Sequence, residues 1–118
     1  MREIKFRVWD YEKMTTDLSI LDLYKYRGGW DRIEIMQYTG RKDKNGKEIY
    51  EGDIVEGLVM FQDNLIKVKG VIKFVHGRFV IAKYNCSLYE FANIPSKKSN
   101  EIEVIGNKYE NFELKGGE

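Results

Sequence analysis

Alternating apolar and polar residues form the clearest local signal in the first part of the chain. Near the N-terminus, Ile4, Phe6 and Val8 alternate with charged side chains. A period of two residues is typical of a strand with one buried face, and a similar pattern at 32–38 predicts a second strand. Residues 18–26 combine leucines and tyrosines at a spacing that does not separate strand from helix, and we interpret them as a strand.

Turn signals divide the rest of the chain into short elements. Asn45-Gly46 is typical of a tight hairpin because both turn positions favour a positive φ angle. The apolar run at 54–61 predicts a strand that opens after Gly52-Asp53, and the run at 101–105 predicts a last short strand. In contrast, residues 87–90 match a helix capping box and predict one helical turn.

The segment 66–84 forms the best-defined predicted unit. With His76-Gly77 as a two-residue turn, two apolar residues of each strand lie opposite one another on one face, namely Phe74 with Phe79 and Ile72 with Ile81. We expect these four side chains to be buried. The opposite face collects four basic residues, which we expect to contact water or a partner: Lys67, Lys69, Lys73 and Arg78.

Length and composition favour a single mostly-β domain. The 118 residues are enough for one core, and 42% hydrophobic with 33% charged residues excludes a disordered or collagen-like chain. No apolar run has the length of a membrane span, and the N-terminus lacks the apolar stretch of a signal peptide, so we expect a cytoplasmic protein. Six or seven short strands between turns predict a small barrel or an open meander.

Basic residues are unevenly distributed although the net charge is only +1. Residues 64–89 carry five basic side chains and no acidic one, whereas the segments on either side are net acidic. Cations with apolar residues between them suit a nucleic-acid backbone or an acidic protein surface. A solvated strand face, or an interface with acidic segments of this chain or a second copy, explains the same pattern.

Few residues suggest catalysis. His76, the single histidine, lies in a predicted turn, and we interpret Cys86, the single cysteine, as a small buried residue. Glu48, Glu51 and Asp53 are the best candidate metal ligands, but the first and last of them have opposite strand parity. We therefore interpret this acidic run as structural and expect no enzyme, no metal or cofactor site and no small-molecule substrate.

Three blocks of sequence are distinctive enough to compare with known families. They read REIKFRVWD at Arg2–Asp10, QYTGRKDKNGKEIYEGDIV at Gln37–Val55 and IEVIGNKYEN at Ile102–Asn111. Together they resemble the YopX family of bacteriophage and prophage proteins over essentially the whole chain. The chain departs from the family pattern at three positions. The family usually has an apolar residue at the position of Arg41, Pro at that of Phe112 and Leu at that of Lys115.

The resemblance implies a phage or prophage origin and a β-rich fold with a small SH3-like barrel in the C-terminal half. We accordingly expect one domain with an N-terminal β segment at 1–38, a barrel segment at 39–118 and at most short helical turns. The family brings no catalytic residues. We expect a non-enzymatic module that binds a protein partner or assembles with itself through its strand edges. The alternative is a nucleic-acid-binding accessory protein that uses the basic hairpin 66–84.

Overall fold

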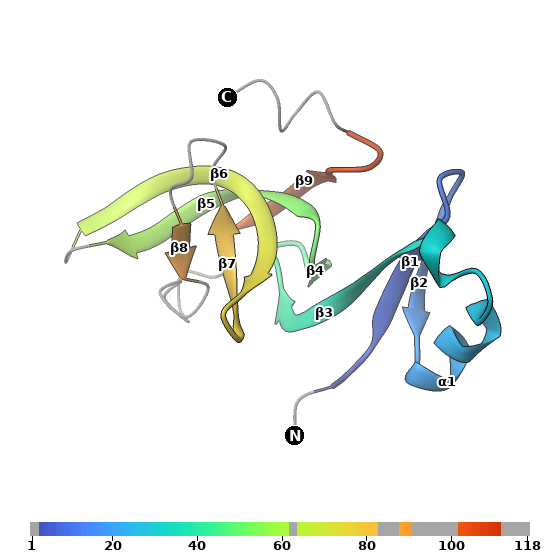
Figure 1. Cartoon of the computed structure of the whole chain (residues 1–118). Coiled ribbons are helices and arrows are strands. Elements are labelled where there is room, and N and C mark those ends of the chain that lie inside the picture. The colour runs from blue at the N-terminus through green and yellow to red at the C-terminus, as the bar shows by residue number, and fades with distance from the viewer. Residues whose placement is uncertain (1–2, 62–63, 83–87, 91–101, 112–118) are drawn as a thin grey trace.

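Two antiparallel sheets make up most of the protein. The computed structural model describes residues 3–61, 64–82, 88–90 and 102–111. In the first sheet the strand order is β2-β1-β3-β4, with bounds Phe6–Trp9 for β1, Met14–Leu18 for β2, Glu34–Lys42 for β3 and Glu48–Tyr50 for β4 (Figure 1). The mostly-β prediction is confirmed, whereas the SH3-like character and the segment boundary at residue 38, which β3 crosses, stay predictions.

The second sheet has the order β8-β7-β6-β5-β9. Its strands are β5 at Asp53–Phe61, β6 at Asn64–Val75, β7 at Arg78–Ala82, β8 at Leu88–Glu90 and β9 at Glu103–Asn107. The long strand β6 curves strongly around a core (Figure 1) that includes Ile49, Val55, Ile72 and Ile81. The helical turn predicted at 87–90 is wrong, because Leu88–Glu90 pair with β7 as a strand. Cys86 lies outside the described residues.

The predicted register of the β6–β7 hairpin is confirmed. Phe74 lies opposite Phe79, and the turn residues His76 and Gly77 have φ angles of 52° and 83°. Ile72, Phe79 and Ile81 are buried as expected, but Phe74 is 50% exposed. The pairing of β5 with β6 stops at Val71, so Phe74 extends beyond the last paired residue of β5.

Strand parity in the first sheet departs from the prediction. Met36 and Tyr38 are buried, whereas Ile35 is 40% exposed, and Arg7 is buried although its charge predicted a solvent-facing position. Arg7 lies directly opposite Met36 on the neighbouring strand, so both side chains are on the same face. Contacts between the two sheets, rather than the polarity of single residues, decide which side of these strands is covered.

A buried ion pair joins the two sheets. Arg7 Nη2 lies 2.8 Å from Asp53 Oδ1 and donates a second hydrogen bond to the Glu51 carbonyl oxygen at 3.0 Å. The Tyr50 amide donates to Asp53 Oδ2 at 2.8 Å, so both carboxylate oxygens have partners. Burial raises the pKa of Asp53, and the Arg7 guanidinium and the Tyr50 N–H counteract this increase.

A turn forms at Asn45-Gly46 as predicted, but only Gly46 has a positive φ angle, 80°, and the loop runs from the end of β3 at Lys42 to the start of β4 at Glu48. A buried carboxylate organises this longer loop. Asp43 Oδ1 accepts hydrogen bonds from the amides of Asn45 and Lys47 at 2.8 and 2.9 Å. Asp43 Oδ2 accepts from the amide of Val104 in β9 at 2.9 Å. One side chain therefore fixes both a local turn and a strand 61 residues later in the chain.

Candidate functional site

The predicted basic surface is divided in the structure. Lys67, Lys73 and Arg78 are exposed, whereas Lys69 is partly buried and lies opposite Glu56 of β5. Between the two ends of this face, three apolar residues are buried: Val71, Val80 and Ala82. The four cations therefore share a strand parity, as predicted, without forming a continuous cationic surface with exposed apolar residues between them.

The acidic run at 48–53 has three separate structural roles. Glu48 forms an ion pair with Lys5, Glu51 Oε1 accepts from the Gln37 amide at 2.8 Å, and Asp53 contacts Arg7. This outcome agrees with the structural interpretation. No group of three His, Cys, Asp or Glu residues in the described ranges is arranged to hold a metal ion.

A helical connector lies between β2 and β3 and consists of α1 at Ile20–Leu23, η1 at Tyr24–Tyr26 and η2 at Trp30–Arg32. The strand predicted at 18–26 is therefore wrong beyond Leu18. Ser19 starts the helix because its Oγ accepts from the Asp22 amide at 3.2 Å, while the Asp22 carboxylate accepts from the Ser19 amide at 2.8 Å. The helices are only four and three residues long, which agrees with the expected short helical turns.

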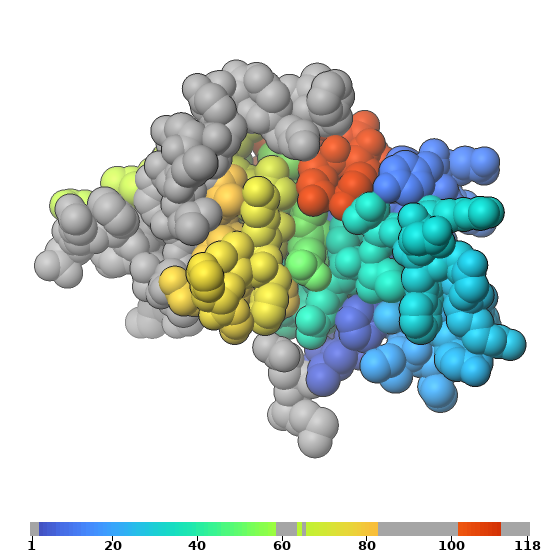
Figure 2. All heavy atoms as spheres, viewed as in Figure 1, coloured from blue at the N-terminus to red at the C-terminus, as the bar shows by residue number. Residues whose placement is uncertain are grey.

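The connector directs large apolar side chains to solvent. Four of them are 51–79% exposed and are called the connector patch: Ile20, Leu21, Tyr24 and Trp30. Leu23 is the buried residue of α1. The Trp30 indole is fixed by donation from Nε1 to the Leu23 carbonyl oxygen at 3.1 Å, and Arg27 lies over the Tyr24 ring at 4.4 Å. The cyan and light-blue connector occupies one end of the molecule (Figure 2).

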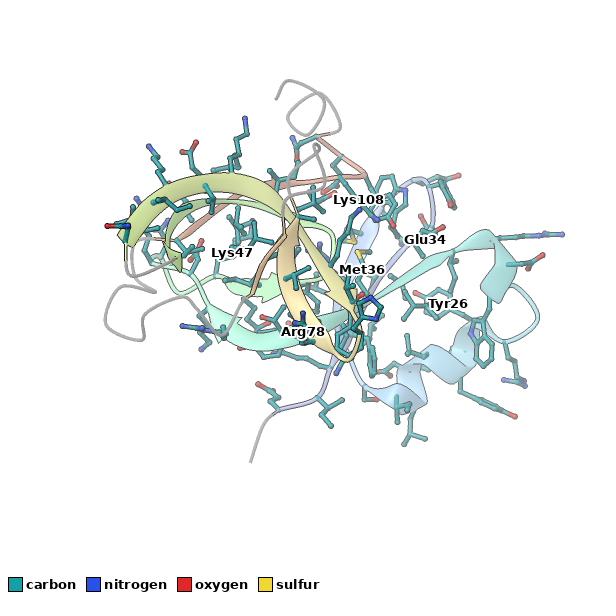
Figure 3. All side chains as sticks on the ribbon, turned by 60° about the vertical axis from the view of Figure 1, so that its left-hand side comes forward. Tyr26, Glu34, Met36, Lys47, Arg78 and Lys108 are labelled. Atoms are coloured by element: carbon teal, nitrogen blue, oxygen red, sulfur yellow. The ribbon has the colours of Figure 1, made fainter. Side chains whose placement is uncertain are left out.

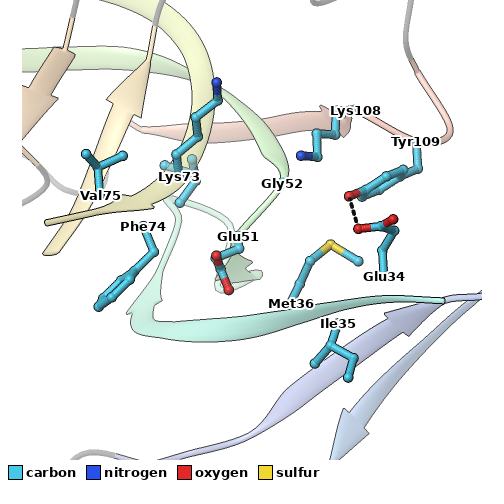
Figure 4. Close-up of a pocket in the computed structure, with 11 residues that line it drawn as sticks. Glu34, Ile35, Met36, Glu51, Gly52, Lys73, Phe74, Val75, Lys108 and Tyr109 are labelled. Atoms are coloured by element: carbon cyan, nitrogen blue, oxygen red, sulfur yellow. Dashed lines mark hydrogen bonds between the residues drawn. The ribbon is translucent and has the colours of Figure 1, made fainter. Parts of the chain in front are cut away.

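A concave feature, the junction groove, lies where the two sheets meet. It has a volume of about 270 Å³. Its walls come from β3, from the end of β6 and from the turn after β9, and its lining includes Met36, Gly52, Lys73, Phe74 and Tyr109. Figure 3 places Glu34, Met36 and Lys108 together at this junction, and Figure 4 shows the groove from close by.

Hydrogen bonds hold the carboxylates and the tyrosine of the groove in place. The Glu34 carboxylate accepts from the Tyr109 hydroxyl at 3.4 Å and from the Tyr11 hydroxyl at 2.8 Å. Trp9 stacks on Tyr109 with ring centroids 5.9 Å apart. Lys108 Nζ also lies over the Tyr109 ring, 5.1 Å from its centroid. Burial, together with Glu34, raises the pKa of Tyr109 to about 12.

Sequence reasoning missed both the connector patch and the junction groove. The pattern Ser19-x-x-Asp22 was a detectable helix-start signal, and it would have separated the helical interpretation from the strand. No comparable signal exists for the groove, because its lining comes from four separate parts of the chain. None of the helices in the described part of the chain is both long and apolar enough to cross a membrane.

Comparisons with known proteins agree on one family. The crystal structure of protein EF1440 from Enterococcus faecalis matches 97% of this chain and 99% of its own, with a TM-score of 0.64 and 26% identity. The crystal structure of protein yopX from Bacillus subtilis covers 97% and 98% of the two chains, with a TM-score of 0.56 and 22% identity. A search of curated protein sequences gives no match. The sequence model described as YopX protein matches residues 5–114, and the chain therefore belongs to the YopX family.

Proposed function

We propose that this chain is a non-enzymatic phage or prophage accessory protein that binds another protein in the cytoplasm of its bacterial host. The observation that supports this proposal is the connector patch, where Ile20, Leu21, Tyr24 and Trp30 are all more than half exposed. Isolated apolar residues are common on protein surfaces, but contiguous groups of large ones mark interaction sites. Tyrosine and tryptophan are also among the residues that contribute most to protein interfaces.

Local order makes the connector suitable for binding. Reciprocal hydrogen bonds between Ser19 and Asp22 fix the start of the helix, and the Trp30 indole is fixed on Leu23. A segment that is already ordered loses less conformational entropy when it associates. Binding energy from burial of the apolar side chains is then less offset by the cost of ordering the loop.

Charge around the patch favours a partner with an apolar centre and an acidic rim. Three exposed cations belong to the connector, namely Lys25, Arg27 and Arg32. Against them are two acidic residues, of which Asp22 is engaged in the helix cap and lies 3.8 Å from Lys25. The excess of cations provides complementarity to acidic side chains around the apolar contact.

The test uses matched variants of exposed apolar residues. The wild-type protein and two variants, Leu21→Asp in the patch and Ile4→Asp outside it, serve as baits in the organism that carries the gene. We expect a protein retained by the wild type and by Ile4→Asp to be lost by Leu21→Asp, with unchanged melting temperatures. Equal retention by all three baits would exclude the patch as the binding surface. Sedimentation velocity then shows whether the partner is a second copy.

Nucleic-acid binding is the second candidate and depends on the exposure of Lys67, Lys73 and Arg78. Three phosphate contacts give a slope of about −3 for log affinity against log salt concentration. In this alternative, the Lys67→Ala/Lys73→Ala variant reduces the magnitude of the slope by about two for labelled DNA. Absence of binding by the wild type at low salt, or the same slope for both proteins, would exclude it.

A further inference from the structure

Part of β3 presents an open strand edge to the junction groove. On one side β3 pairs with β1, and the Tyr38 amide donates to the Lys5 carbonyl oxygen at 2.9 Å. Backbone groups of successive residues alternate in direction, so Ile35 N–H and C=O point away from β1. The β4 pairing begins only at Tyr38, and no strand among the described residues covers Ile35 on this side.

The end of β6 presents a second open edge to the same groove. The Ile72 carbonyl oxygen accepts from the Gly52 amide at 2.8 Å, which shows that it points towards the start of β5. By the same alternation, the backbone groups of Phe74 point in that direction, away from β7. The β5 ladder reaches only Val71, so no described strand pairs with Phe74 on this side.

We propose that the junction groove binds an extended peptide segment of a partner protein, which adds as a strand to the open edges at Phe74 and Ile35. Unpaired backbone groups at a sheet edge are a template for another strand, and peptide-binding domains use this mode of recognition. The inference rests on the proposed role in protein binding but uses a surface other than the connector patch. Figure 4 shows the two edges on opposite sides of the groove, with Gly52 between them.

Side chains around the groove define the sequence that the peptide carries. The half-exposed Phe74 ring and the Met36 thioether, which lies in the floor, favour an apolar side chain at alternate positions of the peptide. The exposed Lys73 ammonium and the Lys108 ammonium at the groove favour an acidic residue beside it. Glu34 and Glu51 oppose this charge less than their number suggests, because Tyr11, Tyr109 and the Gln37 amide already bind their oxygens.

The experiment selects binders from random heptapeptides displayed on yeast, with the full chain as the target. We expect enriched sequences that alternate apolar residues and contain an acidic one. A synthetic copy of the most enriched peptide should bind at least tenfold more weakly to Lys73→Glu and to Phe74→Ala. The matched control is Lys67→Glu, an exposed lysine of the same strand outside the groove, which should bind like the wild type.

Amide hydrogen exchange provides the structural readout. Bound peptide should slow exchange of the Ile35 and Phe74 amides at least tenfold, and a peptide that is N-methylated at alternate amides should not. The proposal is overturned if no peptide is enriched, if the groove variants bind as well as Lys67→Glu, or if neither amide is protected. Because Leu21→Asp should leave peptide binding unchanged, failure here is distinguishable from failure of the connector patch.

Discussion

The ion pair between Arg7 and Asp53 provides a quantitative test of how the two sheets are held together. Arg7 is 5% exposed and Asp53 is 1% exposed, so water cannot compensate for the loss of either partner. Asp53→Asn keeps an oxygen acceptor for the Tyr50 amide but leaves the guanidinium buried without a counter-charge. Removal of one partner of a buried pair costs about 3–5 kcal/mol, which corresponds to a decrease in melting temperature of about 12–20 °C for a domain of this size.

Urea denaturation at neutral pH measures this loss of unfolding free energy. A double-mutant cycle that combines Asp53→Asn with Arg7→Met isolates the interaction free energy between the two side chains. In Arg7→Met the carboxyl of Asp53 loses the charge that opposes its raised pKa. The pKa of Asp53 in the folded variant then lies further above its value in the unfolded chain. Relative to the wild type, Arg7→Met should therefore become more stable as the pH falls. The double variant should cost clearly less than the sum of the single variants, because it leaves no unpaired charge.

Two results would refute this reasoning. One is a cost below about 1 kcal/mol for Asp53→Asn, which would mean that the guanidinium finds water or another acceptor. The other is additivity of the single variants within about 0.5 kcal/mol, which is the behaviour of independent sites. Lys25→Met is the control, since Lys25 and Asp22 are an exposed pair 3.8 Å apart and its loss should leave the urea midpoint unchanged.

Three further predictions concern single side chains. Tyr109, with a pKa of about 12, should ionise after the other tyrosines whose side chains the structure describes in a spectrophotometric titration, and Tyr109→Phe should remove this component. Because its pKa is raised by folding, its contribution to stability is complete below pH 10 and should be lost as the pH rises to about 12. Phe79→Ala should cost about 3–5 kcal/mol in urea denaturation and the half-exposed Phe74→Ala clearly less, and equal costs would contradict the observed burial. Gly70→Ala should cost about 1–3 kcal/mol by the same measurement, because its Cβ would lie 2.6 Å from the Ala82 carbonyl oxygen.

Local signals were sufficient to predict the hairpin but not its surroundings. The turn at His76-Gly77 and its apolar pairs determine the register within a few residues, so the sequence alone was enough. The exposure of Phe74 depends on where a different strand stops pairing, which no local pattern records. Likewise, the capping-box pattern at 87–90 was overridden by pairing with β7, since an edge strand offers these residues hydrogen bonds from a neighbour.

The candidate surfaces illustrate the same limit. Lys69 belongs to a stretch without acidic residues, yet strand pairing brings Glu56 directly opposite, so counting charges along the chain overestimated the basic surface. Arg7 follows the polar positions of its strand, but its guanidinium is paired with Asp53, 46 residues away. Both outcomes depend on contacts between elements distant in sequence, whereas composition and periodicity report only on neighbours.

The buried carboxylate of Asp43 also has a consequence for the order of folding. Its bonds to Asn45 and Lys47 close a short loop, so the turn can form before any distant contact. Asp43 Oδ2 gains its bond to the Val104 amide later, because β9 can dock only after the intervening strands have placed it nearby. We predict that Val104→Ala accelerates unfolding without slowing refolding, and a slower refolding limb in stopped-flow measurements would contradict this order. A chain shortened before β9 would keep its turn but lose the contact that completes it.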